Sequence, residues 1–238
     1  MNINLLHGDC LEIMKDIPDG SVDLVLTDPP YGISFQSQWK KNKADWKPKI
    51  LNDEKPFTGF IPELKRIVSK NGAVMIFTRW DVQQEFIDCM VKNAMKPKNV
   101  LIWDKVIHGM GDLKRAYGSR YESVIYWANS DFRFNGKRPT DILRYQRVSA
   151  NKLLHPNEKP IDLLSCMIKQ TTSDNATVLD CFMGSGSTGV ACLNTNRNFV
   201  GIELDDEYFE IAKHRINEAR NKPEQIQIYQ KEQKQNNK

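Results

Sequence analysis

Cysteine is scarce in this chain, and its distribution argues against a metal site. The five cysteines are scattered and odd in number, and they lack the close paired spacing that zinc sites use. Most are expected to be small core residues of a protein in a reducing cytoplasm. We therefore expect no metal ion at Cys10, Cys89, Cys166, Cys181 or Cys192.

Long apolar runs are absent as well. No stretch approaches the roughly 18 consecutive apolar residues of a membrane-spanning helix. The first ten residues, MNINLLHGDC, lack a basic segment followed by a long apolar one, so they do not resemble an export signal. The length of 238 residues suits one substantial core. These features predict a cytoplasmic protein with no membrane partner, folded as a single domain over residues 1–238.

A strong net charge is a third feature that the chain lacks, because its formal charge is only +4. The basic residues are nevertheless concentrated in two segments. Nine Lys or Arg stand against four Asp or Glu between residues 105 and 147, and five lysines alternate with two tryptophans in WKKNKADWKPK at 39–49. Either segment alone is typical of a solvated loop. Together they favour a surface that binds a polyanion such as a nucleic acid.

What the chain does have is a regular alternation of short apolar runs with helical patterns, which predicts an α/β domain with a mostly parallel sheet. Seven strands are expected, at 3–8, 22–27, 72–78, 99–105, 122–129, 177–182 and 198–204. Helices are expected at 10–17, 57–70, 81–95, 160–171, 187–195 and 206–220. Four segments fit poorly: a basic loop at 33–55, expected to be mobile, two basic irregular stretches at 106–121 and 130–155, and a polar, partly disordered tail at 222–238.

A glycine-rich loop follows the predicted strand TVLDCF. Its sequence, MGSGSTG, places glycines at 184, 186 and 189, which is the G-x-G-x-x-G spacing. The next predicted strand ends at Glu203, whose carboxylate can accept hydrogen bonds from both hydroxyls of a ribose. A tight turn without a ligand is the alternative. The strand, glycine turn, helix and distal acid together predict a nucleoside-containing ligand.

This strand–turn–helix unit lies near the wrong end of the chain for an ordinary dinucleotide-binding domain, where it comes first. A circular permutation explains the order if the N-terminal strand at 3–8 lies beside the strand at 198–204. Asp9 would then lie at the carboxyl edge of the sheet, next to the nucleoside, where it can accept from the amine of an adenine. An equally good role for Asp9 is the N-cap of the following helix, and the two are compatible.

The tetrapeptide DPPY at 28–31 ends the apolar run VDLVLT. Prolines cannot continue a central strand, and each fixes its own φ and restricts the residue before it. If the strand at 22–27 lies on the other side of the glycine strand, Asp28 reaches the same sheet edge. Asp28 and a proline carbonyl can accept the two hydrogens of an exocyclic amine and free its lone pair, while Tyr31 stacks on the base. Pro29 and Pro30 would hold these groups rigidly.

Three motifs in this order, DPPY, HPNEKP at 155–160 and DCFMGSGSTG at 180–189, resemble the beta-class S-adenosylmethionine-dependent amino-methyltransferases of DNA found in restriction-modification systems. The resemblance implies a Rossmann-like, seven-stranded, mostly parallel sheet of the class I methyltransferase type, circularly permuted, with a DNA-recognition insert at 106–152. It implies that Lys159 lies near the carboxylate of the cofactor, although a surface lysine at a helix start, with Pro160 first in that helix, is the alternative. The other cofactor-binding residues would be Asp9, Cys10, Asp180, Phe182, Gly184, Ser185, Gly186, Thr188, Glu203 and Leu204.

The resemblance also predicts the substrate. In this family the adenine enzymes typically carry Asp first in the tetrapeptide and the cytosine-N4 enzymes Ser, so Asp28 points to adenine N6. The base must be flipped out of double-stranded DNA. Methylation at cytosine carbon 5 needs a cysteine nucleophile, usually after proline, and no cysteine here follows a proline. Candidate DNA contacts are Lys40, Lys41, Arg115, Arg120, Arg144 and Arg147, with nonspecific surface charge as the alternative for each.

Other functions stay open at this point. A NAD-dependent oxidoreductase would share the glycine loop and the distal acid but leaves DPPY unexplained. A binding protein that has lost catalysis, a cytosine-N4 enzyme and an enzyme acting on RNA are the remaining alternatives. The resemblance favours a homodimer. A companion restriction endonuclease is compatible with the family, but no residue pattern points to one.

Overall fold

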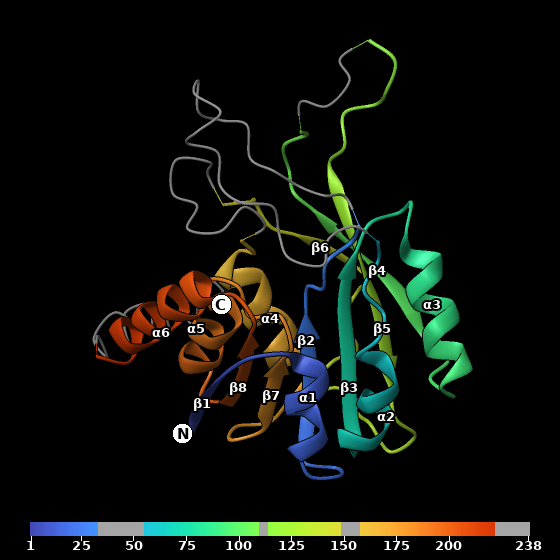
Figure 1. Ribbon diagram of the computed structural model, residues 1–238. Coiled ribbons are helices and arrows are strands. Elements are labelled where there is room, and N and C mark those ends of the chain that lie inside the picture. The colour runs from blue at the N-terminus through green and yellow to red at the C-terminus, as the bar shows by residue number, and fades with distance from the viewer. Residues whose placement is uncertain (33–54, 110–113, 149–157, 222–238) are drawn as a thin grey trace.

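The computed structural model describes residues 1–32, 55–109, 114–148 and 158–221. Its described strands form one eight-stranded sheet in the order β1-β8-β7-β2-β3-β5-β4-β6 (Figure 1). The predicted tail at 222–238, nearly all of the loop at 33–55, and Lys40 and Lys41 lie outside the described residues. The strands are β1 Ile3–His7, β2 Val22–Thr27, β3 Val68–Thr78, β4 Asn99–Asp104, β5 Tyr121–Ala128, β6 Ile142–Arg144, β7 Thr177–Asp180 and β8 Asn198–Glu203.

The sheet confirms the α/β fold class with mostly parallel pairing. Among the described strands only β5 is antiparallel to its neighbours, β3 and β4. The eighth strand, β6, lies inside a stretch that was expected to be irregular, and it pairs with β4 at the edge of the sheet. Of its three residues only Leu143 is buried. A three-residue edge strand with one inward side chain is too short to show alternation in the sequence.

The predicted circular permutation is also confirmed. β1 pairs in parallel with β8, from Ile3 opposite Phe199 to His7 opposite Glu203. β7, the strand that precedes the glycine turn, pairs in parallel with β8 on one side and with β2 on the other, where Leu24 lies opposite Val178. Strands from the two ends of the chain therefore lie side by side, and their carboxyl ends meet at one edge of the sheet.

Helices cover both faces of this sheet (Figure 1). The central strand β2 is accordingly apolar on both sides, with Leu24, Val25 and Leu26 fully buried. Within the described ranges, no helix combines the length and the apolar character that a membrane crossing requires. The helices are α1 Cys10–Ile13, the 3₁₀ turn η1 Met14–Asp16, α2 Ile61–Ile67, α3 Gln83–Lys92, α4 Ile161–Thr171, α5 Ser187–Asn194 and α6 Asp206–Arg220.

The glycine turn packs against α6 at Gly186. Gly186 is the residue before α5 and has a left-handed φ of 78°. A Cβ added there would lie 3.0 Å from Ala212 Cβ and 3.1 Å from Ile216 Cδ1, both on α6. The side of Gly186 that a side chain would occupy therefore faces α6. Glycine is needed here for backbone conformation and for the contact between the turn and α6.

Replacing Gly186 by Val is expected to destabilise the whole domain. The left-handed φ and the overpacking against α6 should together lower the free energy of unfolding by about 2–4 kcal/mol. Thermal unfolding of the protein without ligand measures this loss. Gly136→Val is the matched control, because Gly136 also has a positive φ of 97° but has nothing within 4 Å of the added Cβ. Equal losses in the two variants would show that α6 does not constrain the turn.

Candidate active site

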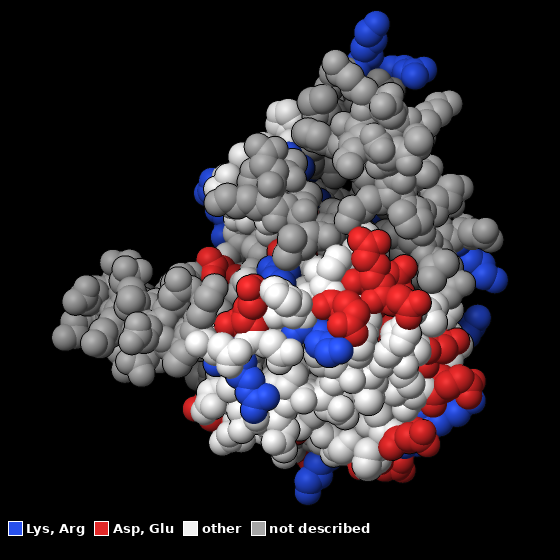
Figure 2. All heavy atoms as spheres, turned by 60° about the vertical axis from the view of Figure 1, so that its left-hand side comes forward, with Lys and Arg blue, Asp and Glu red and all other residues white. Residues whose placement is uncertain are grey.

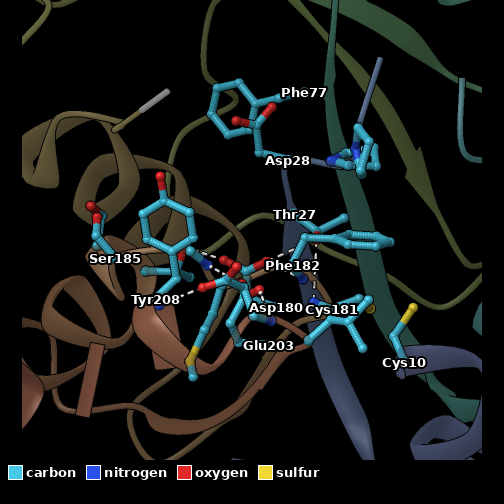
Figure 3. Close-up of a pocket in the computed structure, with 18 of the residues that line it drawn as sticks. Cys10, Thr27, Asp28, Phe77, Asp180, Cys181, Phe182, Ser185, Glu203 and Tyr208 are labelled. Atoms are coloured by element: carbon cyan, nitrogen blue, oxygen red, sulfur yellow. Dashed lines mark hydrogen bonds between the residues drawn. The ribbon is translucent and has the colours of Figure 1, made fainter. Parts of the chain in front are cut away.

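A pocket opens at the carboxyl edge of the sheet, where β1, β2, β7 and β8 end (Figure 3). β2 delivers all four residues of DPPY to its wall, and β7 delivers the residues that begin the glycine turn. Residues just before α4 and Tyr208 of α6 complete the lining. Every predicted cofactor residue except Gly186 is among the residues that line it. The motifs predicted to meet at one sheet edge therefore lie around one cavity.

Asp28 is the most constrained group of this pocket. Its Oδ2 accepts a hydrogen bond from the ammonium of Lys159. Its Oδ1 is shielded from solvent and has no hydrogen-bond partner among the described residues. Burial raises the pKa of Asp28 to about 7, although the Lys159 ammonium opposes that rise. Oδ1 is therefore a buried acceptor whose hydrogen-bonding capacity is not satisfied by the described residues.

Lys159 is held by more than Asp28. Its Nζ lies 3.4 Å from Oε2 of Glu122, at the start of β5, and 5.0 Å from the centroid of the Phe77 ring of β3. Glu122 is also paired with Lys105, whose Nζ lies 2.6 Å from Oε1. Sequence reasoning missed Glu122. The available signal was an acidic residue near the start of the otherwise apolar strand β5. That signal does not indicate that Lys159 is its partner.

Pro30 and Tyr31 are held by the segment that begins at residue 55. The carbonyl of Pro30 accepts from the backbone N–H of Phe57 at 3.0 Å, and Tyr31 forms an isolated β-bridge with Pro56. Tyr31 is only 4% exposed, and among the described residues its hydroxyl has no partner. The Pro30 carbonyl thus keeps one lone pair and the Pro29 carbonyl is the other candidate acceptor of the motif.

Glu203 ties the glycine turn to the end of β8. Its Oε2 accepts from the N–H of Gly184 at 2.8 Å, and its Oε1 accepts from the N–H of Asp205 at 2.9 Å. Burial raises the pKa of Glu203, and the backbone donors oppose that rise. Each oxygen keeps a second lone pair. Glu203 therefore orders the turn, and it still has acceptor capacity toward the pocket.

Asp180 links the two motifs of the site. Its Oδ1 accepts from the hydroxyl of Thr27, the residue before Asp28, at 2.8 Å. Its Oδ2 accepts from the hydroxyl of Thr188, in the first turn of α5, at 2.7 Å. Burial raises the pKa of Asp180, and these hydroxyls oppose the rise. One buried carboxylate thus joins β2, β7 and α5.

Asp9 has the capping role that was one of its two predicted roles. Its Oδ1 accepts from the N–H of Leu11 at 2.9 Å, which caps α1, and the residue also lines the pocket. Cys10 lies next to it, and burial raises the pKa of its thiol to about 12. Burial also raises the pKa of Cys181 well above its ordinary value. Neither thiol in this pocket is a thiolate at neutral pH.

The arginines predicted to contact DNA lie beside the β4, β5 and β6 ends of the same sheet edge. Arg120 forms a two-pronged pair with Asp104, at 2.6 and 2.7 Å, and Nε of Arg144 lies 3.9 Å from the same carboxylate. Arg115 and Arg147 are exposed. Figure 2 shows basic side chains projecting at the upper end of the molecule, while both signs are mixed on the lower part of that face. DNA contact by these arginines stays a prediction.

Comparison with known proteins supplies the context for this geometry. Type II methyltransferase M2.MboI of Moraxella bovis is 29% identical over 254 residues, covering 91% of this chain and 88% of the relative. DNA adenine methyltransferase YhdJ of Escherichia coli is 28% identical over 255 residues, covering 90% and 83%.

Two solved structures share the architecture. The crystal structure of M1.HpyAVI in complex with SAM matches with a TM-score of 0.71 at 28% identity, covering 90% of this chain and 99% of that one. PvuII DNA methyltransferase, described as cytosine-N4-specific, matches with a TM-score of 0.72 at 15% identity, covering 93% and 92%, which is a likeness of fold alone. A family model for N6 and N4 enzymes, described as DNA methylase, matches residues 22–214. Because that model spans most of the chain, the protein belongs to the N6/N4 family of DNA methylases.

Proposed function

We propose that this protein transfers the methyl group of S-adenosylmethionine to N6 of an adenine flipped out of double-stranded DNA. Membership of the family makes the chain a DNA amino-methyltransferase that uses S-adenosylmethionine. The adenine base and the roles of individual residues are the proposal. The observation that carries it is that Oδ1 of Asp28, in the same pocket as the glycine turn, has no hydrogen-bond partner among the described residues.

The pocket residues fit the cofactor. Glu203 offers free lone pairs at the end of β8, where a ribose would lie, and its hold on Gly184 presents the turn to the methionine part. Phe182, Met183 and Leu204 add apolar wall for the adenine and the thioether chain. We assign the cofactor to these residues together with Asp9, Cys10, Asp180, Ser185 and Thr188. Gly186 supports the turn through its packing on α6.

The DPPY residues act on the substrate amine. S-adenosylmethionine supplies a methyl group on a positively charged sulfur, which leaves as a neutral thioether with the electron pair of the broken C–S bond. Oδ1 of Asp28 accepts one hydrogen of the amine and the Pro29 carbonyl accepts the other. The nitrogen lone pair, withdrawn from the ring, then forms the new N–C bond. The methylated nitrogen is cationic and acidic, and it gives one proton to Asp28, which releases it to solvent.

Two features favour an adenine amine. The tetrapeptide begins with Asp, and the chain is 28% identical to a relative named as a DNA adenine methyltransferase. Likeness to the cytosine-N4-specific PvuII enzyme is one of fold and carries no weight on the base. Methylation of cytosine carbon 5 is disfavoured, because both cysteines of the pocket have strongly raised pKa values.

The base is tested by digesting methylated duplex DNA to nucleosides and measuring them by mass spectrometry. We expect N6-methyldeoxyadenosine as the product when the purified protein acts on unmethylated bacterial DNA with S-adenosylmethionine. N4-methyldeoxycytidine instead would overturn the adenine assignment and keep the activity class. RNA of matched sequence is the control substrate, and preferential labelling of RNA would contradict the DNA proposal.

Asp28→Asn is expected to lower the rate of methyl transfer by about 10²–10⁴-fold, because it removes the charged acceptor while keeping its size. Affinity for S-adenosylmethionine, measured by calorimetry, should change only a few-fold. The control is Asp131→Asn, an exposed carboxylate in the loop after β5. Parallel losses of rate and affinity in Asp28→Asn would contradict the separation of roles.

The rate should also depend on pH in a defined direction. The acceptor is the ionised form of Asp28, and burial raises its pKa to about 7. Activity is therefore expected to rise as the pH increases through that region and to be lost toward acid pH. Single-turnover rates between pH 5.5 and 9 measure the profile. A rate that is flat below neutral pH would show that Asp28 is ionised throughout and that burial does not control it.

A further inference from the structure

A chain of four buried or half-buried charges runs from the catalytic carboxylate across the sheet edge, and the reaction described above uses only its first member. Asp28 contacts Lys159, Lys159 contacts Glu122, and Glu122 contacts Lys105. The side chain of Lys159 is 7% exposed, and the other three are between 17% and 20% exposed. Such burial is costly unless each charge has a partner, so the arrangement is a specific one.

The fold assembles this cluster from four neighbouring strands. Asp28 follows β2, Phe77 lies on β3, Glu122 lies on β5 and Lys105 follows β4, in the order in which these strands adjoin. β5 is antiparallel, so its first residues reach the edge where the other strands end. Lys159, two residues before α4, is held between Asp28, Glu122 and the face of Phe77. The lysine is therefore fixed from three sides.

We infer that Lys159 and Glu122 are positioning residues for methyl transfer: Lys159 binds Oδ2 of Asp28 so that Oδ1 faces the substrate amine, and Glu122 holds Lys159 in place from the far side. The inference rests on the proposed function of Asp28. A carboxylate can rotate about its last bond, and a single strong donor on one oxygen fixes the direction of the other. Oδ1, which is buried and has no hydrogen-bond partner among the described residues, is the atom that this arrangement leaves available to a donor.

The same contacts set the charge of Asp28. Burial raises its pKa most, Lys159 just before α4 lowers it, and Glu122 on β5 and Asp180 on β7 raise it; these are the charged groups that act on it from the described residues. Asp28 and Glu122 in turn raise the pKa of Lys159, against the effect of burial, so the lysine stays protonated. Burial raises the pKa of Glu122, but the opposing effect of Lys159 and Lys105 is larger. The net result is a lowered pKa, so Glu122 stays ionised.

Substituting the two residues should therefore move the titration of Asp28 in opposite directions. Lys159→Met removes the cation and should raise the pKa of Asp28 by about 1–3 units, so that the acid side of the pH–rate profile moves to higher pH. Glu122→Gln removes an anion, so the acid side should move to lower pH, while the maximal rate falls because Lys159 is less firmly held. Lys159→Arg keeps the charge and should restore most of the profile.

A second readout does not depend on activity. The carboxyl carbon of Asp28 can be titrated by ¹³C NMR in the protein without cofactor, and it is identified by its loss in Asp28→Asn. Lys213→Met and Glu210→Gln provide matched controls, because this lysine–glutamate pair on α6 is exposed and lies outside the pocket. The controls should leave both the titration and the pH–rate profile unchanged.

Three results would overturn the inference. If the titration of Asp28 is unchanged in both Lys159→Met and Glu122→Gln, the cluster has only a structural role. A Lys159→Met enzyme that raises only the KM for S-adenosylmethionine would assign the lysine to the cofactor carboxylate. If Lys159→Met does not fold, as judged by circular dichroism, an unshifted Asp28 titration in Glu122→Gln would still refute the proposal. A wild-type protein that methylates no DNA would instead refute the proposed function.

Discussion

The hydrogen bonds from Thr27 and Thr188 to the single carboxylate of Asp180 hold the site together. Thr27 precedes Asp28 on β2, Asp180 ends β7, and Thr188 lies in the first turn after the glycine loop. Because the carboxylate is buried, both donors are needed to offset its loss of hydration. The register of β2 against β7, the place of Asp28 and the start of α5 are therefore coupled through one side chain. Movement of the DPPY motif relative to the glycine turn would deprive the buried Asp180 carboxylate of a hydrogen bond, so the separation of the two motifs is strongly constrained.

Around this link the pocket divides into two chemical environments. On the β7 and β8 side, Glu203 and the glycine turn offer backbone groups, a carboxylate and apolar wall, which suit a nucleoside with a charged tail. On the β2 and β3 side, Asp28, Lys159 and Glu122 form a nearly dry ionic cluster against the ring of Phe77. Figure 3 shows Asp28 and Phe77 on one side of the pocket and Glu203 with Tyr208 on the other. A methyl donor held on one side and an amine held on the other would face each other across Asp180 and Phe182.

The sequence contained the topology of the site more fully than its electrostatics. Strand adjacency could be inferred because a glycine turn, a distal acid and DPPY each need the carboxyl edge of a parallel sheet, and only one arrangement of β1, β2, β7 and β8 brings them together. Glu122 could not be found in this way, because its partner Lys159 is distant in sequence and lies outside any strand. The packing of Gly186 was hidden for the same kind of reason: the G-x-G-x-x-G spacing is compatible both with ligand contact and with packing on α6, and the contact with Ala212 and Ile216 is visible only in the structure. A cofactor contact at Gly186 stays a prediction. The strand β6 has three residues and one inward side chain, which is too few to produce an alternating apolar pattern in the sequence.

The polar face beyond the pocket follows a different logic from its interior. Asp104 engages Arg120 through two hydrogen bonds, which hold its pKa well below the ordinary range, and Arg144 lies near the same carboxylate. Both arginines are exposed, and exposed ion pairs contribute little because water competes for each charge. The charges of Arg120 and Arg144 are therefore open to water, whereas Lys159 is enclosed together with Asp28. A cation and a carboxylate are thus paired both at the rim and inside the pocket, and the burial of the cation is what distinguishes the two pairs.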